Sequence, residues 1–572
     1  PFYTTTLAIK VSSENLGGLI NFEILLDSSN KIDELTPFGE TNNTYTFQHL
    51  IKQQKPSILV PINDAIVSTS EVKLVVQIPG YSGTLRTIDI EIDSLPFFTS
   101  PIVSTSISTD KTLLKEKLSL PSSENKDYYL RTRYTESGKV SEWSYGTFGF
   151  LQGDSQGWTE GNRWKFLETS SNYLEIDSLT GNFQFQRTNS EEYLIETGGD
   201  GIGQFGMSRW IVVDGWPAIY GWWPQNGVNL MVIDNNTGER YMEQNSAFNL
   251  ALPKPWAPFP AGRPYTTTGE KCGVYHYNTN LLDIQDSLAA FLDRIPENYH
   301  LILNSAQNCD VPNWKPNLWA ALDNFGVSKI KTIGKGDPFT VISDKKSINP
   351  SPAKEYIADY SSPVTPPQMQ RFSNGITFQP FAESGNIESK PIGPVSEWYT
   401  LTVFFSNLNS TDSFNIDVFK STNGVNWVNE MRSVNSSTID LSSIDANTYP
   451  FVKFNVNLFD NDHRSAAAID RWKINCKNLN EGSIVLDDNF KFNYDTLDQG
   501  ANLELALNFT NITERAYDSS GYYIAIKNLA NGNIDTVKHG QIGKLNPEAA
   551  IILYDTISTK NINGNFELLL AV

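Results

Sequence analysis

Apolar residues alternate with polar residues along most of this chain of 572 residues. Four clear examples lie at residues 72–78, 88–92, 452–458 and 503–509. Because successive side chains of a strand point to opposite faces, this pattern is typical of strands with one face in a core and one in water. Asn-Gly, Asp-Ser and Ser-Gly turns separate short strands, which indicates antiparallel pairing. The sequence therefore predicts a mainly β protein made of tandem antiparallel β-sandwiches.

One segment has a helical period instead. Between residue 278 and Pro296, apolar residues recur on one helical face, at Ile284, Leu288, Phe291, Leu292 and Ile295. A strand at 300–304 follows, and a second helix begins near Pro316 and is capped by Gly326. Together with a strand at 228–233, these elements predict one α/β module among the sandwiches.

Length and charge narrow the class of protein. At about 150 residues per domain, the chain is long enough for about four domains. Its 44 basic and 64 acidic residues give a formal net charge of −20, which excludes nucleic acid as a partner because phosphate recognition needs a basic face. No apolar run approaches the length of a membrane-spanning helix. Since the chain starts at Pro1 and stops inside an apolar run, we expect a mature product or a fragment of a longer chain.

Most motifs that could carry catalysis have a simpler structural explanation. The glycines at 201, 203 and 206 match a dinucleotide-binding fingerprint, but a strand-like run at 208–213 follows where that motif requires a helix. The five histidines are scattered, and Cys272 with His276 is too small a ligand set for a zinc site. We therefore expect no catalytic residue, no metal site and no organic cofactor.

Three cysteines cannot build a disulfide scaffold, but they allow one local pair. Cys272 and Cys309 both lie in the predicted α/β module, where they form either a disulfide or two buried thiols. Cys476 follows Trp-Lys-Ile-Asn and is predicted to be an isolated thiol in a strand.

Two pairs of carboxylates raise the possibility of structural calcium. Asp460 with Asp462, and Asp487 with Asp488, lie at predicted sandwich edges. Calcium takes six to eight oxygen ligands, so each pair alone supplies too few. Solvated turns are the commoner reason for such clusters.

An aromatic cluster in the α/β region is the strongest candidate for an interaction surface. Its members are Trp210, Trp216, Tyr220, Trp222, Trp223 and Trp256. Exposed tryptophans at this density stack on sugars or form protein-binding hot spots. The alternative, which the residues favour, is a core edge where the α/β module meets a sandwich.

Several stretches resemble known modules. Residues 31–43, ending in Glu-Thr-Asn-Asn, resemble the closing strand of a CARDB-type sandwich, and residues 487–572 resemble the opening strands of another one, cut before its end. Between them, Tyr-Tyr-Leu-Arg-Thr-Arg-Tyr at 128–134, followed by Ser-Glu-Trp-Ser at 141–144 and Phe148, is similar to the last strands of a fibronectin type III domain.

The middle of the chain resembles two further modules. Gly-Val-Asn-Leu-Met-Val-Ile-Asp at 227–234 and the helical unit that ends near Gly326 resemble the ILEI domain. Ile-Gly-Pro-Val at 392–395, Ile-Asp-Ala at 444–446 and Arg-Trp at 471–472 resemble a jelly-roll module. The order of these modules is similar to the C-terminal region of PorU-like, gingipain-related proteins of the type IX secretion system of Bacteroidetes.

This resemblance implies a domain plan. The plan has part of a CARDB-like sandwich at 1–50, a fibronectin type III-like sandwich at 51–152, a jelly roll at 153–208 and 351–480, an inserted ILEI-like α/β module at 209–350, and a truncated CARDB-like sandwich at 481–572.

The resemblance also implies a function. The expected function is a non-catalytic scaffolding region at the cell surface, associated with the outer membrane and with other type IX secretion or outer-membrane proteins. Two alternatives stay open. In the first alternative, the chain is an accessory region of a sortase-like cysteine peptidase whose catalytic domain lies upstream of Pro1. In the second, it is a carbohydrate-binding adhesin module that binds a glycan through the tryptophan cluster.

Overall fold

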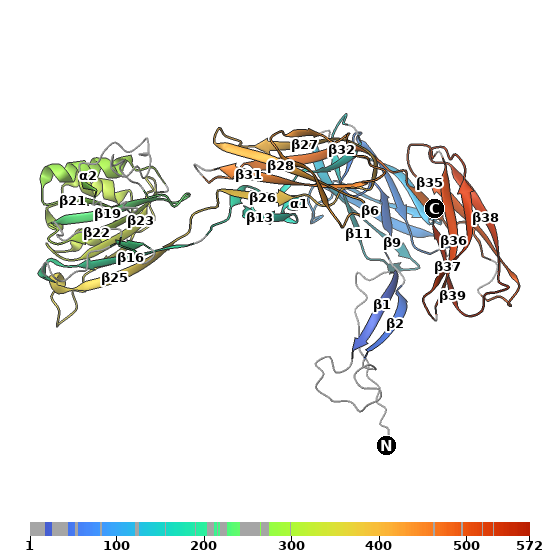
Figure 1. The fold of residues 1–572 in the computed structure, drawn as a ribbon, viewed down its shortest axis with the longest axis horizontal. Helices are drawn as coiled ribbons and strands as arrows, with labels where there is room; N and C mark the ends of the chain where they lie inside the picture. Colours follow the sequence, from blue (N-terminus) through green and yellow to red (C-terminus); the bar gives the residue numbers. More distant parts are fainter. Residues whose placement is uncertain are drawn as a thin grey trace, which may run out of the picture.

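The computed structural model describes most of the chain and confirms a mainly β protein with several antiparallel sheets (Figure 1). Within the described residues, no helix combines the length and the apolar character needed to cross a membrane. The described ranges are 18–25, 44–51, 55–80, 83–120, 125–154, 156–188, 190–202, 211–213, 216–217, 226–240, 263–264, 274–297, 299–460, 464–492, 496–517, 519–529 and 531–571.

The first sandwich has a three-stranded sheet, β3-β5-β8, facing the strands β4-β11-β9-β6-β7. Ile88, Ile90 and Ile92 point inward and are fully buried, as their alternation predicts. Tyr128 and Phe148 stack in the same core with ring centroids 5.4 Å apart. The strands are β3 Ser57–Val60, β4 Ala65–Val67, β5 Glu71–Gln77, β6 Arg86–Asp93, β7 Val103–Thr109, β8 Leu113–Ser119, β9 Lys126–Glu136, β10 Lys139–Val140 and β11 Ser144–Phe150.

The second sandwich is built from two distant parts of the chain. One hydrophobic core takes Trp158 and Phe166 from before the α/β module, and Phe454 and Trp472 from after it. Its elements are β12 Gly157–Glu160, α1 Arg163–Leu167, β13 Ser170–Asn172, β14 Leu174–Ile176, β15 Phe183–Phe185, β26 Ser384–Glu388, β27 Val395–Ser406, β28 Asp412–Ser421, β29 Val428–Val434, β30 Thr438–Asp440, β31 Phe451–Asp460 and β32 Ala468–Asn478.

The inserted module has three layers. A six-stranded sheet, β20-β21-β19-β22-β23-β24, is covered by helices on one face and by the sheet β18-β17-β16-β25 on the other. Its described strand pairs are antiparallel. The elements are β16 Glu191–Gly198, η2 Asp200–Ile202, β17 Ile211–Val213, β18 Trp216–Pro217, β19 Gly227–Asp234, β20 Arg263–Pro264, β21 Val274–Tyr277, α2 Leu282–Arg294, β22 Tyr299–Ala306, η3 Val311–Asn313, α3 Pro316–Asp323, η4 Lys329–Thr332, β23 Phe339–Asp344, β24 Lys354–Ile357, η5 Pro367–Met369 and β25 Arg371–Phe378.

The inserted module extends further along the chain than the expected range 209–350. β16 and β25 pair over eight residues, and together with β24 they belong to the sheets of this module. The physical reason is that β19 is buried along its whole length, so both faces of its sheet need a cover. β16 and β25 provide that cover on the face opposite the helices, through residues such as Tyr193 and Phe378.

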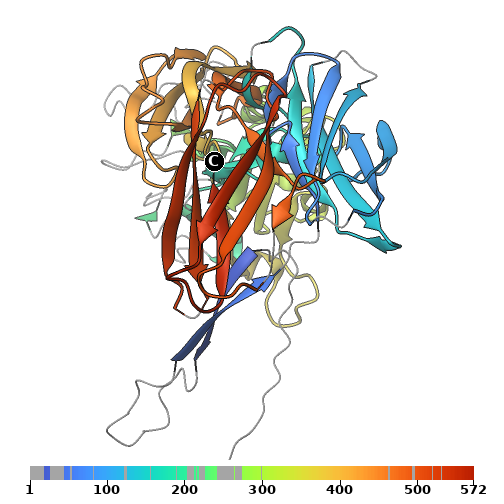
Figure 2. The same cartoon turned by 90° about the vertical axis from the view of Figure 1, so that its right-hand side faces the viewer.

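The C-terminal sandwich lies at the opposite end of the molecule from the inserted module (Figures 1 and 2). A sheet built on β35 faces the sheet β37-β36-β39. A two-stranded hairpin, β1 Gly18–Leu25 with β2 Thr44–Ile51, projects from the first sandwich (Figure 1). The C-terminal strands are β33 Gly482–Val485, β34 Lys491–Phe492, β35 Asn502–Asn511, β36 Ser520–Asn528, β37 Ile534–Ile542, β38 Ala550–Ser558 and β39 Phe566–Ala571.

Candidate functional site

The first and second sandwiches share a sheet at the point where they meet. β12 of the second sandwich bridges β4 of the first through Trp158 and Ala65, so the strand order runs β30-β27-β32-β12-β4-β11-β9-β6-β7. Gly157 permits the close approach of β12 to β32, because a Cβ at this position would lie 2.0 Å from the carbonyl oxygen of Ile474. A glycine is therefore required at position 157, where β12 begins.

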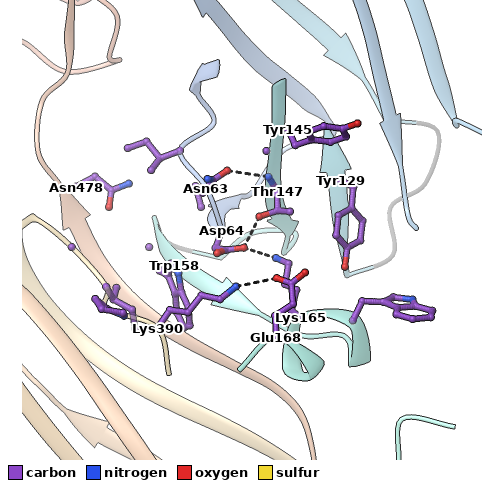
Figure 3. A pocket seen from close by; sticks show the side chains of 18 of the residues that line it. Asn63, Asp64, Tyr129, Tyr145, Thr147, Trp158, Lys165, Glu168, Lys390 and Asn478 are labelled. Carbon is purple, nitrogen blue, oxygen red and sulfur yellow. Dashed lines mark hydrogen bonds and ion pairs between the residues drawn. The ribbon is translucent and has the colours of Figure 1, made fainter. Parts of the chain in front are cut away.

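A pocket of about 880 Å³ lies at this junction (Figure 3). Tyr129 and Tyr145 of the first sandwich line one side, and Lys390 and Asn478 of the second line the other. Asp64 lies between them. Pockets of this size at domain interfaces are common ligand sites, which makes this the candidate functional site.

A buried cluster of charges lies at this junction, and two of its members, Asp64 and Lys165, line the pocket. Lys165 of α1 places its Nζ 2.7 Å from Asp64 Oδ1 and 3.4 Å from Asp127 Oδ2. Arg471 reaches the other oxygen of Asp127 at 2.7 Å. The side chains of Lys165 and Asp127 are only 4% and 0% exposed. Burial alone would lower the pKa of Lys165, but Asp127 and Asp64 outweigh it and raise that pKa.

Glu160 of β12 adds a further carboxylate beside this cluster. Trp472 donates from Nε1 to Glu160 Oε2 at 3.0 Å, and Lys390 Nζ lies 3.4 Å from Oε1. Burial, and to a smaller extent the charge of Asp64, raises the pKa of the Glu160 carboxyl to about 7 against the opposing effect of Lys390. Glu160 is therefore partly protonated near neutral pH.

We expect the stability of the folded chain to depend on pH through Glu160. The folded chain holds this proton more tightly than the unfolded chain, whose glutamate has its ordinary pKa of 4.5. The stabilisation is complete below pH 4.5 and is lost as the pH rises through 7, a change of at most about 3 kcal/mol. Glu160→Gln should flatten this dependence and raise the melting temperature at pH 8, as measured by calorimetry from pH 5 to 8. A melting curve for Glu160→Gln that keeps the wild-type pH dependence would contradict this.

The paired charges give the cluster a structural role at the junction. Lys165 and Arg471 of the second sandwich pair with Asp64 and Asp127 of the first, and Asp127 also accepts from the backbone N–H of Gly161 at 2.7 Å. Cys476 lines the pocket, but burial raises the pKa of its thiol to about 12, so it is protonated and a poor nucleophile. The arrangement is suited to holding two domains together and to binding a ligand.

The predicted aromatic surface lies largely outside the described residues. Trp216 begins strand β18, and nothing further is described of its side chain. The interaction surface therefore stays a prediction. The members outside the described ranges are Trp210, Tyr220, Trp222, Trp223 and Trp256.

The cysteine pair also stays a prediction, because Cys272 lies outside the described residues. Cys309 is buried, and its Sγ lies 3.5 Å from Thr279 Oγ1. Burial raises the pKa of this thiol to about 12. Cys476 lies in β32, the position that the sequence predicts.

The carboxylates proposed as calcium ligands accept hydrogen bonds from neighbouring side chains and backbone N–H groups. Asp460 Oδ2 accepts from the N–H and hydroxyl of Ser465, and Asp487 accepts from Asn489 N and Asn508 Nδ2. Asp462 lies outside the described ranges. In the part of the chain that the structure describes, no group of three or more His, Cys, Asp or Glu residues is placed to hold a metal ion.

Sequence reasoning did not find the charge cluster. Its residues come from segments more than 300 positions apart, such as Asp127 and Arg471. The segment at 471–472 stood out only as a feature of a jelly roll. The burial of Glu160 at the end of β12, where every residue is buried, became visible only in the structure.

Comparison with known proteins identifies no family. The sequence matches no model of a known protein family, and no curated protein matches it. A Salmonella alpha-2-macroglobulin mutant aligns with 93% of this chain at 10% identity and a TM-score of 0.24, and the E. coli alpha-2-macroglobulin with 95% at 8% and 0.25. The chain covers only 40% and 41% of those two proteins.

A third similar structure comes from a study of carbohydrate-binding modules of the β-sandwich superfamily. It aligns with 76% of this chain and over its own whole length, at 6% identity and a TM-score of 0.14. TM-scores this low establish neither a common fold for the whole chain nor a common function.

Proposed function

We propose that this chain is a non-catalytic scaffolding region of a type IX secretion system component at the bacterial cell surface, where it positions partners or cargo at the outer membrane. The observation that carries the scaffolding role is that the described modules meet through structured junctions. The order of modules in the sequence supports the assignment to type IX secretion.

The first junction is the shared sheet with its buried charge cluster. The second joins the first sandwich to the C-terminal one, where Val75 and Leu113 pack against Val485 and Ile512. Thr112 strengthens it, because its hydroxyl both donates to the carbonyl of Leu486 and accepts from the N–H of the same residue. These contacts fix the three sandwiches relative to one another.

The third junction is a two-stranded ribbon that carries the inserted module. Thr188 N donates to Pro380 O and Ala382 N donates to Gln186 O, both at 2.8 Å. Arg187 lies over the ring of Phe381, 4.2 Å from its centroid. The ribbon continues the β16–β25 ladder, so the module is held at the end of the molecule opposite the C-terminal sandwich (Figure 1).

A rigid ribbon predicts a narrow distance distribution between the inserted module and the second sandwich. Spin labels at Ala290→Cys on α2 and Leu408→Cys in the turn after β27, in a Cys272→Ser background, report this distance by pulsed EPR. Replacing Thr188 and Ala382 by proline removes both N–H donors and should broaden the distribution. A distribution that is already broad in the parent chain would contradict a rigid scaffold.

The secretion assignment needs a separate experiment. The full chain is immobilised and exposed to outer membranes of a Bacteroidetes species that uses type IX secretion, and the retained proteins are identified by mass spectrometry. We expect enrichment of secretion-system components over a control β-sandwich protein of similar net charge. Equal recovery of secretion-system components on the chain and on the control protein would contradict the assignment to type IX secretion.

A further inference from the structure

We propose that the pocket between the first and second sandwiches is a binding site for a neutral oligosaccharide. Its lining residues come from both sandwiches and are other residues than those of the predicted tryptophan cluster. The argument rests on the chemistry of the pocket rim and on the pairing of the strands that form its walls.

The rim presents aromatic rings to solvent. Phe97, in the loop after β6, is 58% exposed, and Tyr145 of β11 is 62% exposed. Trp164 of α1 packs edge-on against Phe97, with ring centroids 5.1 Å apart, so the two sandwiches meet at the rim through aromatic side chains. Exposed rings offer flat apolar faces with a polar edge, which is a surface suited to the C–H face of a sugar.

The charged groups of the pocket carry both signs, in two pairs and one further carboxylate, Glu481, whose pKa is raised by burial. The pocket lining includes the carboxylates of Asp64, Glu168 and Glu481 and the ammonium groups of Lys165 and Lys390. Asp64 and Lys165 neutralise each other, and Lys390 lies 3.5 Å from Glu168. A ligand with a large net charge would meet groups of its own sign, so the pocket favours a neutral one.

The groups nearer the rim offer both donors and acceptors. The Lys390 side chain is 41% exposed and that of Glu168 74%, and the Tyr145 hydroxyl and the Asn478 amide add groups that donate and accept. A polyhydroxyl ligand needs this mixture, because each of its hydroxyls both donates and accepts.

A peptide is a poorer fit to the same walls. β4 pairs with β11 on one side and with β12 on the other, and β12 pairs with β32. A peptide that adds to a sheet needs an unpaired strand edge for its backbone. The strands at this pocket are already paired on both sides, so side-chain recognition of a neutral ligand fits better.

Isothermal titration calorimetry of the full chain tests the proposal. The probes are cellotetraose, maltotetraose and mannotetraose, with tetragalacturonate and an eight-residue peptide pool as charged and peptidic competitors. We expect saturable binding of at least one neutral tetrasaccharide, weakened at least about tenfold by Tyr145→Ala or Phe97→Ala because each removes a stacking surface. Tyr554→Ala, an equally exposed tyrosine on the C-terminal sandwich, should leave the affinity unchanged.

Several outcomes would overturn the proposal. They are the absence of binding to all three neutral probes, tighter binding of the peptide pool or of tetragalacturonate, and an affinity that Tyr145→Ala does not change. Trp222→Ala combined with Trp223→Ala should retain binding, and loss of binding in that variant alone would move the glycan site to the tryptophan cluster. None of these outcomes depends on the secretion assignment, so the pocket and the scaffold are tested separately.

Discussion

Lys165→Ala should destabilise the junction of the first two sandwiches by about 3–5 kcal/mol, the cost typical of leaving a buried charge without its partner. The substitution removes the only ammonium group that bridges Asp64 and Asp127 among the described contacts. Asp127 keeps Arg471, but Asp64 is left with the hydroxyl of Thr147. Calorimetry measures the loss in stability. Faster hydrogen exchange at β4 and β12 would locate that loss at the junction.

Lys117→Ala is the matched control for this variant. Lys117 pairs with Glu71 at 3.1 Å, but both side chains are well exposed, so water replaces the partner at little cost. We therefore expect the melting temperature of Lys117→Ala to stay close to that of the parent chain. Equal losses in the two lysine variants would show that the buried cluster does not hold the junction.

Phe166→Ala should cost the second sandwich about 3–5 kcal/mol, because it removes a large ring from a close-packed core. Phe166 is 2% exposed and packs edge-on against Trp472, with centroids 4.9 Å apart, and against Phe183 at 5.8 Å. The expected result is faster hydrogen exchange in β26, β31 and β32, measured by mass spectrometry. Phe404→Ala removes a 44% exposed ring from the same sandwich and should have a much smaller effect.

These two predictions separate the two faces of one short helix. α1 has five residues, and consecutive positions of it face different environments: Lys165 faces the first sandwich and Phe166 the core of the second. Loss of Lys165 should loosen the junction and leave the β26 and β31 core protected. Loss of Phe166 should expose that core. The same exchange pattern in both variants would mean that the junction and the core unfold as one unit.

The strand pattern was predictable because it is local. The alternation at 88–92 and at 452–458 needs only one buried face and one face in water. The apolar residues of both segments are buried, as predicted. Val75 shows the limit of this reasoning. It lies on the side of β5 that the alternation assigns to water, yet it is fully buried, because the C-terminal sandwich covers that face.

The sequence by itself determined the mainly β class and the presence of two helices in one α/β module, because periods of 2 and 3.6 residues are properties of short segments. Only the tertiary structure decided where the inserted module begins, through the pairing of β16 with β25, and which charges meet at the junction. Lys165, Asp64 and Asp127 have no recognisable spacing in the sequence. Their attraction depends on distance in space and on burial, and the pocket above them exists only because two sandwiches meet.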